Sequence, residues 1–150
     1  MINRCAEICG SRVSRGRSCS KICLVKVFIA GNPENFLKTY AVLDDQSNPS
    51  LGHNELFDYF NVPNNLVPYE LKTCSRAMAA SGRHVRNLVI ESFDGTVYLS
   101  LPELTKCNAI PCNSSKIPTP EVARLHSHIC PFAEMFPEPD PEATIVLLIG

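Results

Sequence analysis

Tryptophan is absent from the 150 residues, and aromatic residues make up only 7% of the chain. A base-stacking platform built on Trp is therefore excluded. No apolar run reaches the roughly 18 residues that a membrane-spanning helix needs, and the first residues lack the apolar core of a signal peptide. We therefore expect an intracellular, cytoplasmic chain with reduced thiols and no membrane partner. Only seven glycines accompany twelve prolines, a composition that disfavours long helices.

The formal net charge is only −1, but the charges are unevenly distributed. The first 26 residues carry six Lys or Arg and one Glu (+5), and the other 124 carry eight basic and fourteen acidic residues (−6), which sum to −1. This excludes a wholly basic nucleic-acid-binding protein. Residues 1–21, rich in Arg, Ser, Gly and Cys, predict a flexible basic arm ahead of one domain, residues 22–150. Nucleic-acid binding through this arm stays open.

Eight cysteines are more than usual for this length. In a secreted chain they would indicate disulfides, whereas a cytoplasmic chain favours free thiols or a metal site. Two groups of residues are candidates for zinc. The first has spacings compatible with a four-thiolate site, with free thiols in a mobile arm as the alternative. The second is not in the order of a recognised zinc finger, and its alternative is a surface loop with partly buried cysteines. We expect no cofactor. The candidate ligands are Cys5, Cys9, Cys19 and Cys23 near the start, and Cys107, Cys112, His126, His128 and Cys130 further along.

Hydrophobic patterning predicts a mostly β fold with six or seven strands. Several segments each fit a strand: 22–29 is apolar apart from Lys26, 39–43 is β-branched and aromatic, and 67–73 alternates between apolar and polar residues. Asp94-Gly95 predicts a tight hairpin turn, and the small residues at 77–82 predict the tip of a longer hairpin. The predicted strands are 22–29, 39–43, 67–73, 84–92, 96–101 and the apolar run 144–150.

One short helix is predicted at 54–61, capped by Asn54 and with His53 at its start. Eight of the twelve prolines lie within residues 102–142, which predicts a long, irregular, proline-rich loop. The sequence stops directly after the last apolar run, and we therefore expect a domain truncated at its C-terminal end.

Two carboxylates directly follow an apolar strand. Val42 and Leu43 lead into Asp44 and Asp45, and the polar residues 46–50 cannot continue a buried strand. A solvated turn is one interpretation of these acids. A functional site is the other, because strand ends commonly deliver catalytic side chains to loops.

Three segments in this order resemble the retropepsin-like aspartic peptidases, and more closely the peptidase region of Pao/BEL-type retrotransposon polyproteins. Tyr40-Ala41-Val42-Leu43-Asp44-Asp45-Gln46-Ser47-Asn48 is similar to the strand and acid loop of that family. Glu55-Leu56-Phe57-Asp58-Tyr59-Phe60 follows, and Leu147-Leu148-Ile149-Gly150 closes the chain. The resemblance extends over residues 22–150, and these three segments are its most telling parts.

The resemblance implies a retropepsin-like closed β-barrel and an aspartic endopeptidase that cleaves polypeptide substrates as a homodimer, with one catalytic Asp per chain. Asp44 matches the catalytic position, and Asp45 is the second candidate. Gln46, Ser47, Leu148 and Gly150 would support the catalytic loop. A flap over the substrate would include Arg76, Ala79, Ala80, Ser81 and Gly82.

The chemistry explains why two chains are needed. Two carboxylates about 3 Å apart cannot both ionise, so the pair shares one proton and titrates as a unit. The ionised carboxylate takes a proton from the attacking water, and the protonated one donates to the peptide carbonyl.

The sequence departs from the family pattern after Asp44. Asp45 stands where the family has Ser or Thr, and Gln46 stands where it has Gly. An ionised Asp cannot donate the hydrogen bond that the hydroxyl makes, and Gly permits backbone geometry that Gln does not. The alternative hypothesis is therefore a catalytically degenerate retropepsin-like domain that serves peptide binding or assembly.

Overall fold

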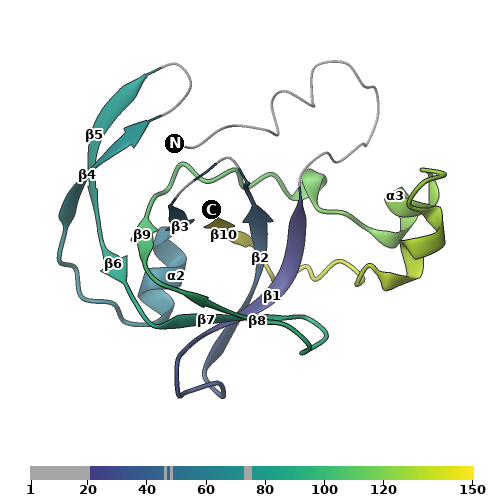
Figure 1. Cartoon of the computed structure of the whole chain (residues 1–150), viewed down its shortest axis with the longest axis horizontal. Coiled ribbons are helices and arrows are strands. Elements are labelled where there is room, and N and C mark those ends of the chain that lie inside the picture. The colour runs from purple at the N-terminus through teal and green to yellow at the C-terminus, as the bar shows by residue number, and fades with distance from the viewer. Residues whose placement is uncertain (1–20, 46, 48, 73–75) are drawn as a thin grey trace.

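The computed structural model describes residues 21–45, 47, 49–72 and 76–150, and the fold of these residues is mostly β. Figure 1 shows a strongly curled sheet, a separate two-stranded hairpin along one side of it, and short helices beyond its other side. None of the helices in this part of the chain has the length and apolar character that crossing a bilayer requires.

The described residues contain ten strands and four short helical segments. The strands are β1 (Ile22–Ile29), β2 (Phe36–Leu43), β3 (Ser50–Gly52), β4 (Val67–Lys72), β5 (Ala77–Gly82), β6 (His84–Val85), β7 (Leu88–Ser92), β8 (Tyr98–Leu101), β9 (Leu104–Lys106) and β10 (Ile145–Ile149). The α-helices are α2 (Asn54–Tyr59) and α3 (Pro120–Arg124), and the 3-10 turns are η2 (Ser114–Lys116) and η3 (Cys130–Met135).

Eight strands form one sheet in the order β6-β9-β3-β10-β2-β1-β7-β8, and β4 pairs with β5 apart from it. β10 lies between two strands that are far earlier in the sequence. It runs parallel to β2 and antiparallel to β3, with Leu148 opposite Val42 on one side and Leu51 on the other. The end strands β6 and β8 do not pair with each other in the described residues, so the sheet is a curled half-barrel.

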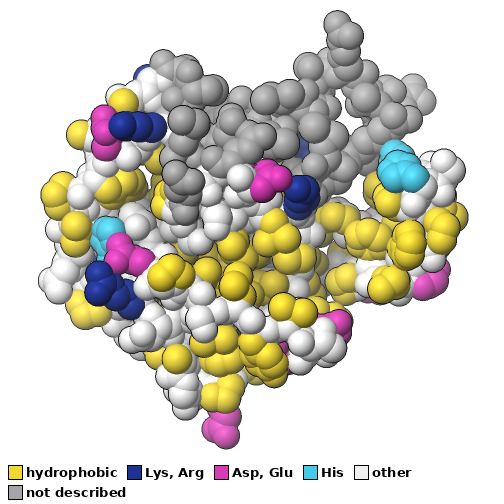
Figure 2. Space-filling view, viewed as in Figure 1, with side chains coloured by type: hydrophobic (Ala, Val, Ile, Leu, Met, Phe, Trp, Pro, Cys, Tyr) yellow, Lys and Arg dark blue, Asp and Glu magenta, His cyan; other side chains and the backbone are white. Residues whose placement is uncertain are grey.

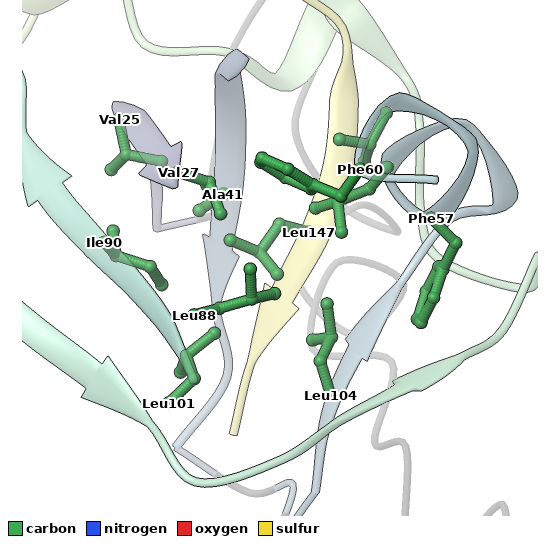
Figure 3. Close-up of a cluster of buried hydrophobic side chains, with 12 residues drawn as sticks. Val25, Val27, Ala41, Phe57, Phe60, Leu88, Ile90, Leu101, Leu104 and Leu147 are labelled. Atoms are coloured by element: carbon green, nitrogen blue, oxygen red, sulfur yellow. The ribbon is translucent and has the colours of Figure 1, made fainter. Parts of the chain in front are cut away.

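The inside of the curl holds the main hydrophobic core. In Figure 3 the side chains of Val27, Ala41, Leu88, Leu104 and Leu147 converge there from five different strands. β10 is buried on both faces, because Val146 and Leu147 belong to this core whereas Ile145 and Leu148 belong to a second cluster. Burial on both faces explains why its sequence is apolar throughout rather than alternating.

The strand predicted at 22–29 is confirmed with the same ends, and those predicted at 39–43, 67–73, 96–101 and 144–150 are confirmed with changed ends. The hairpin tip predicted at 77–82 is wrong, because these small residues form β5 and pair with β4 along its whole length. The strand predicted at 84–92 is broken into β6 and β7 at Asn87, whose φ of 63° is left-handed and cannot continue a strand.

The helix predicted at 54–61 is confirmed but shorter. Its cap is His53, whose Nδ1 accepts from the Glu55 N–H at 3.5 Å, and not Asn54 as predicted. A second helix, α3, was not predicted. Thr119 caps it by accepting from the Val122 N–H at 3.2 Å, and Pro120 occupies its first position, where a missing N–H costs nothing.

Candidate functional site

The loop that joins β2 to β3 begins with Asp44 and Asp45, and we name it the acid loop. It is held against the end of β10. The Asp44 N–H donates to the Ile149 carbonyl at 2.9 Å, and the Leu43 N–H donates to the Lys21 carbonyl at 2.7 Å. Asp44 is 7% exposed. This burial distinguishes Asp44 from an Asp in a solvated turn, which is mostly exposed. The sequence pattern therefore did place a carboxylate at a structured position.

Ser47 makes hydrogen bonds within the loop. It is buried, its N–H donates to the Asp44 carbonyl at 3.4 Å, and its hydroxyl donates to the Pro49 carbonyl at 3.1 Å. This hydroxyl therefore stabilises the local backbone. Gln46 lies outside the described residues.

Gly150 packs against this loop at a position that has no room for a side chain. A Cβ added there would lie against the Pro49 carbonyl oxygen and 2.6 Å from the Ser47 carbonyl oxygen. Its N–H donates to the Ser50 hydroxyl at 3.3 Å. Leu148, two residues earlier, is 1% exposed. The structure thus brings Ser47, Leu148 and Gly150 together around the loop that carries Asp44.

Asp45 has a different environment from its neighbour Asp44. Its side chain is 71% exposed, and its Oδ2 lies 3.0 Å from Nζ of Lys21, which is itself 66% exposed. Such exposed pairs contribute about 0–1 kcal/mol. Asp45 is therefore directed to solvent while Asp44 is enclosed.

The β4–β5 hairpin projects past the edge of the sheet where β2 ends and where the C-terminus lies (Figure 1). Leu71 of β4 belongs to the same buried cluster as Leu51 and Leu148, which flank the acid loop. Ala79, Ala80, Ser81 and Gly82 lie on β5, and Arg76 directly precedes it. These residues form one arm of the hairpin, and the turn between Lys72 and Arg76 lies outside the described residues.

The hairpin is fastened at its base to β9. The Tyr69 hydroxyl donates to the Lys106 carbonyl at 3.0 Å, and a Cβ on Gly82 would lie 2.6 Å from the same oxygen. Burial, with a smaller contribution from Cys107, raises the pKa of Tyr69 to about 12. The hydroxyl therefore stays a neutral donor across the ordinary pH range.

The cysteine groups do not form a metal site in the described residues, which hold no cluster of three or more His, Cys, Asp or Glu side chains. Cys5, Cys9 and Cys19 lie outside those residues. Cys23 lies on β1, where burial raises the pKa of its thiol and disfavours the thiolate that zinc needs. In the proline-rich region, His126 and His128 have ring centroids 5.8 Å apart, Cys107 is buried, and Cys112 and Cys130 are exposed.

An apolar groove lies between β1 and the proline-rich segment, and sequence reasoning did not find it. It encloses a volume of about 320 Å³. Hydrophobic side chains gather on the face between the sheet and the short helices (Figure 2). The groove arises only because residues 117–137 fold back over β1, which no local pattern indicates. Its lining includes Ile22, Leu24, Tyr40, Phe93, Met135 and Phe136.

Comparison with known proteins adds no assignment: no family model matches this chain, and no curated protein matches it either.

Proposed function

We propose that this chain is a retropepsin-like aspartic endopeptidase domain of the Pao/BEL retrotransposon type, acting as a homodimer with one catalytic Asp44 from each chain. Its substrate is an extended polypeptide, bound beneath the β4–β5 hairpin. We also propose that the sheet, a half-barrel in the described residues, corresponds to the closed barrel of that family.

The observation that carries the proposal is the insertion of β10 beside the acid loop. β10 lies between β2 and β3, the two strands that the loop connects, and Ile149 accepts from the Asp44 N–H. The loop is therefore held by a strand about a hundred residues away in sequence, with Gly150 enclosed by two loop carbonyls. A solvated turn needs no such support, whereas a catalytic carboxylate must be held within a narrow geometry.

The chemistry follows from the pairing of two such loops. One Asp44 carboxylate, ionised, accepts a proton from water as the water oxygen attacks the peptide carbonyl carbon. The other, protonated, donates its proton to the carbonyl oxygen. In the second step the tetrahedral carbon expels the amine, which takes up a proton from the pair. One hydroxyl of the tetrahedral intermediate gives its proton back to the pair as the new carboxyl group forms, so the two Asp44 carboxyl groups again share one proton.

The test is cleavage of an unstructured polypeptide by the full chain and by its Asp44→Asn variant, from mildly acidic to neutral pH. We expect the wild type to cleave and Asp44→Asn to lose activity by at least about a thousandfold, because neither proton transfer is then completed. Asp45→Asn is the matched control, since the exposed Asp45 pairs with Lys21 and should be dispensable. Equal activity of wild type and Asp44→Asn would overturn the proposal.

A second candidate function is a catalytically degenerate domain of the same class that binds peptides or supports assembly. The exposed Asp45, held by Lys21, favours it, because a carboxylate at this position cannot donate a hydrogen bond across a dimer. This candidate predicts an inactive wild type and a gain of cleavage in the double variant Asp45→Ser/Gln46→Gly. Wild-type cleavage that depends on Asp44 would exclude it.

A further inference from the structure

Arg83 is a buried charged residue and lies where the β4–β5 hairpin joins the body of the protein. Its side chain is only 8% exposed. Directly before it, Gly82 packs against the Lys106 carbonyl, and the Arg83 carbonyl accepts from the Lys106 N–H at 2.8 Å. The backbone of Arg83 thus belongs to the hairpin base, while its side chain points into the body.

The guanidinium group holds α2 and the loop that follows it. It donates to Asp58 Oδ1 at 2.8 Å, to Asn54 Oδ1 at 2.6 Å and to the Asn54 carbonyl at 3.4 Å. It also donates to the Val62 carbonyl at 3.1 Å, and its carbon lies 5.4 Å from the centroid of the Phe57 ring. A planar donor group used in this way fixes direction as well as distance.

Helix α2 is in turn continuous with the acid loop. It follows β3 directly, and the His53 N–H at its start donates to the Val146 carbonyl at 2.8 Å. Leu56 and Phe57 are fully buried in the core that contains Leu147. A rigid path therefore runs from the loop with Asp44, through β3 and α2, to Arg83 and the hairpin base.

We propose that Arg83 is the positioning residue of the hairpin: by clamping its base to α2, it fixes how the hairpin lies over Asp44 and so sets the affinity for the polypeptide substrate. This inference rests on the proposed peptidase function. Arg83 touches neither substrate nor the reacting atoms, so it acts through the hairpin alone.

The experiment compares Arg83→Lys and Asp58→Asn in the full chain by steady-state peptide cleavage and by hydrogen exchange. Lys keeps the charge but loses the fork of donors, and Asn keeps the shape of the Asp58 side chain but loses its charge. We expect KM to rise about fivefold or more with kcat changed less than about twofold, the pattern of lost binding rather than lost chemistry. Amides of β4 and β5 should exchange about tenfold faster or more, while those of β1 and β2 do not change.

Arg86→Lys is the control, because Arg86 is also paired with a carboxylate but is 75% exposed and holds no part of α2. It should match the wild type in KM and in exchange. If the wild type is active and KM is unchanged in both Arg83→Lys and Asp58→Asn, the positioning role of Arg83 is wrong, and the proposed peptidase function is unaffected. Uniformly faster exchange in all strands would also overturn the positioning role, since that result indicates a general stability role. A wild type without Asp44-dependent cleavage would overturn the proposed function, and the role in substrate affinity with it.

Discussion

At the scale of single residues, Gly150 has the least room for a side chain among the glycines that the structure describes. A Cβ there meets backbone carbonyls of Ser47 and Pro49, which cannot rotate away as a side chain would. We expect Gly150→Ala to push the acid loop outward, because β10, which ends just before Gly150, is hydrogen-bonded to a strand on each side, whereas the described residues of the loop belong to no strand. Displacements near 1 Å can cost a catalytic site about a hundredfold.

Peptide cleavage by Gly150→Ala should therefore fall by about tenfold or more, with a fall in Tm of a few degrees, about the effect of 1 kcal/mol. Near-ultraviolet circular dichroism separates a shifted loop from an unfolded chain. Unchanged cleavage with unchanged Tm would show that the loop tolerates the methyl group and that the close packing does not constrain the site.

Glu103 makes the stability of the fold depend on pH, and its hydrogen-bond partners determine the sign of that dependence. Hydrogen bonds from His84 at 2.7 Å and then from Arg86 at 3.1 Å lower the pKa of this carboxyl. A carboxyl with a lowered folded-state pKa stabilises the fold above its unfolded pKa and loses that contribution as pH falls through the folded value.

The free energy of unfolding of Glu103→Gln should thus lie below that of the wild type at pH 7, by about 1 kcal/mol or less because the site is partly exposed. The difference should shrink as pH falls through the acid range. Urea denaturation at pH 7 and at pH 3 measures it. If the difference in free energy of unfolding between the wild type and Glu103→Gln grew toward pH 3, the pKa of Glu103 would not be lowered in the folded state.

Sequence reasoning found some residues of the candidate site and missed others for a physical reason. Asp44 was found because it follows an apolar strand, and Gly150 only because the closing segment resembles that of the peptidase family. Arg83 was missed, since its partners Asn54 and Asp58 are 29 and 25 residues away. Nothing in the local sequence distinguishes an Arg that turns inward from one that stays solvated.

At the scale of secondary structure elements, β10 contributes most to the packing of the site. Leu147 is 0% exposed and lies among side chains from β1, β2, β7 and β9 (Figure 3). Truncation to Ala leaves a cavity in a core that relaxes only partly. Leu147→Ala should lower the free energy of unfolding by about 2–5 kcal/mol.

Leu125→Ala is the matched control for Leu147→Ala, because Leu125 is 80% exposed directly after α3. It should change the free energy of unfolding by no more than about 0.5 kcal/mol. Denaturant unfolding of both variants gives the comparison. Similar losses in the two variants would contradict the central place of β10.

Elements were predictable where one physical signal dominated. The apolar run of β10 and the Asp94-Gly95 turn, with Gly95 at φ 73°, needed only local information. β5 was mistaken for a hairpin tip because small residues have low strand propensity, and pairing with β4 overrides that propensity. α3 was missed because Pro120 was treated as a breaker, whereas proline is favourable at the first position of a helix.

At the scale of the whole molecule, the mostly β class follows from the sequence, but the strand order does not. β2 and β10 are neighbours although the Thr39 hydroxyl and the Thr144 carbonyl that join them at 2.6 Å are 105 residues apart. Periodicity determines which face of a strand is buried, not which strand lies beside it. Only the resemblance suggested that residues 147–150 lie beneath the acid loop.

In the proposed site each chain supplies only one of the two catalytic carboxylates, so the number of chains that a site needs can be tested. If each site needs one Asp44 from each of two chains, then mixed dimers of wild type and Asp44→Asn are inactive. When the two are mixed in equal amounts at constant total concentration and allowed to exchange subunits, random pairing leaves about a quarter of the dimers with both carboxylates. Cleavage should then fall to about a quarter of the wild-type rate.

A site complete within one chain would instead give about half the rate, because each wild-type chain would act alone. Mixing wild type with Asp45→Asn is the control, and the rate should stay close to that of the wild type, since Asp45 pairs with Lys21 at the surface. Diluting the wild type alone should lower its rate more steeply than in proportion to concentration, because dilution dissociates dimers. A half rate on mixing, together with strict proportionality on dilution, would show that Asp44 does not act as one member of a pair.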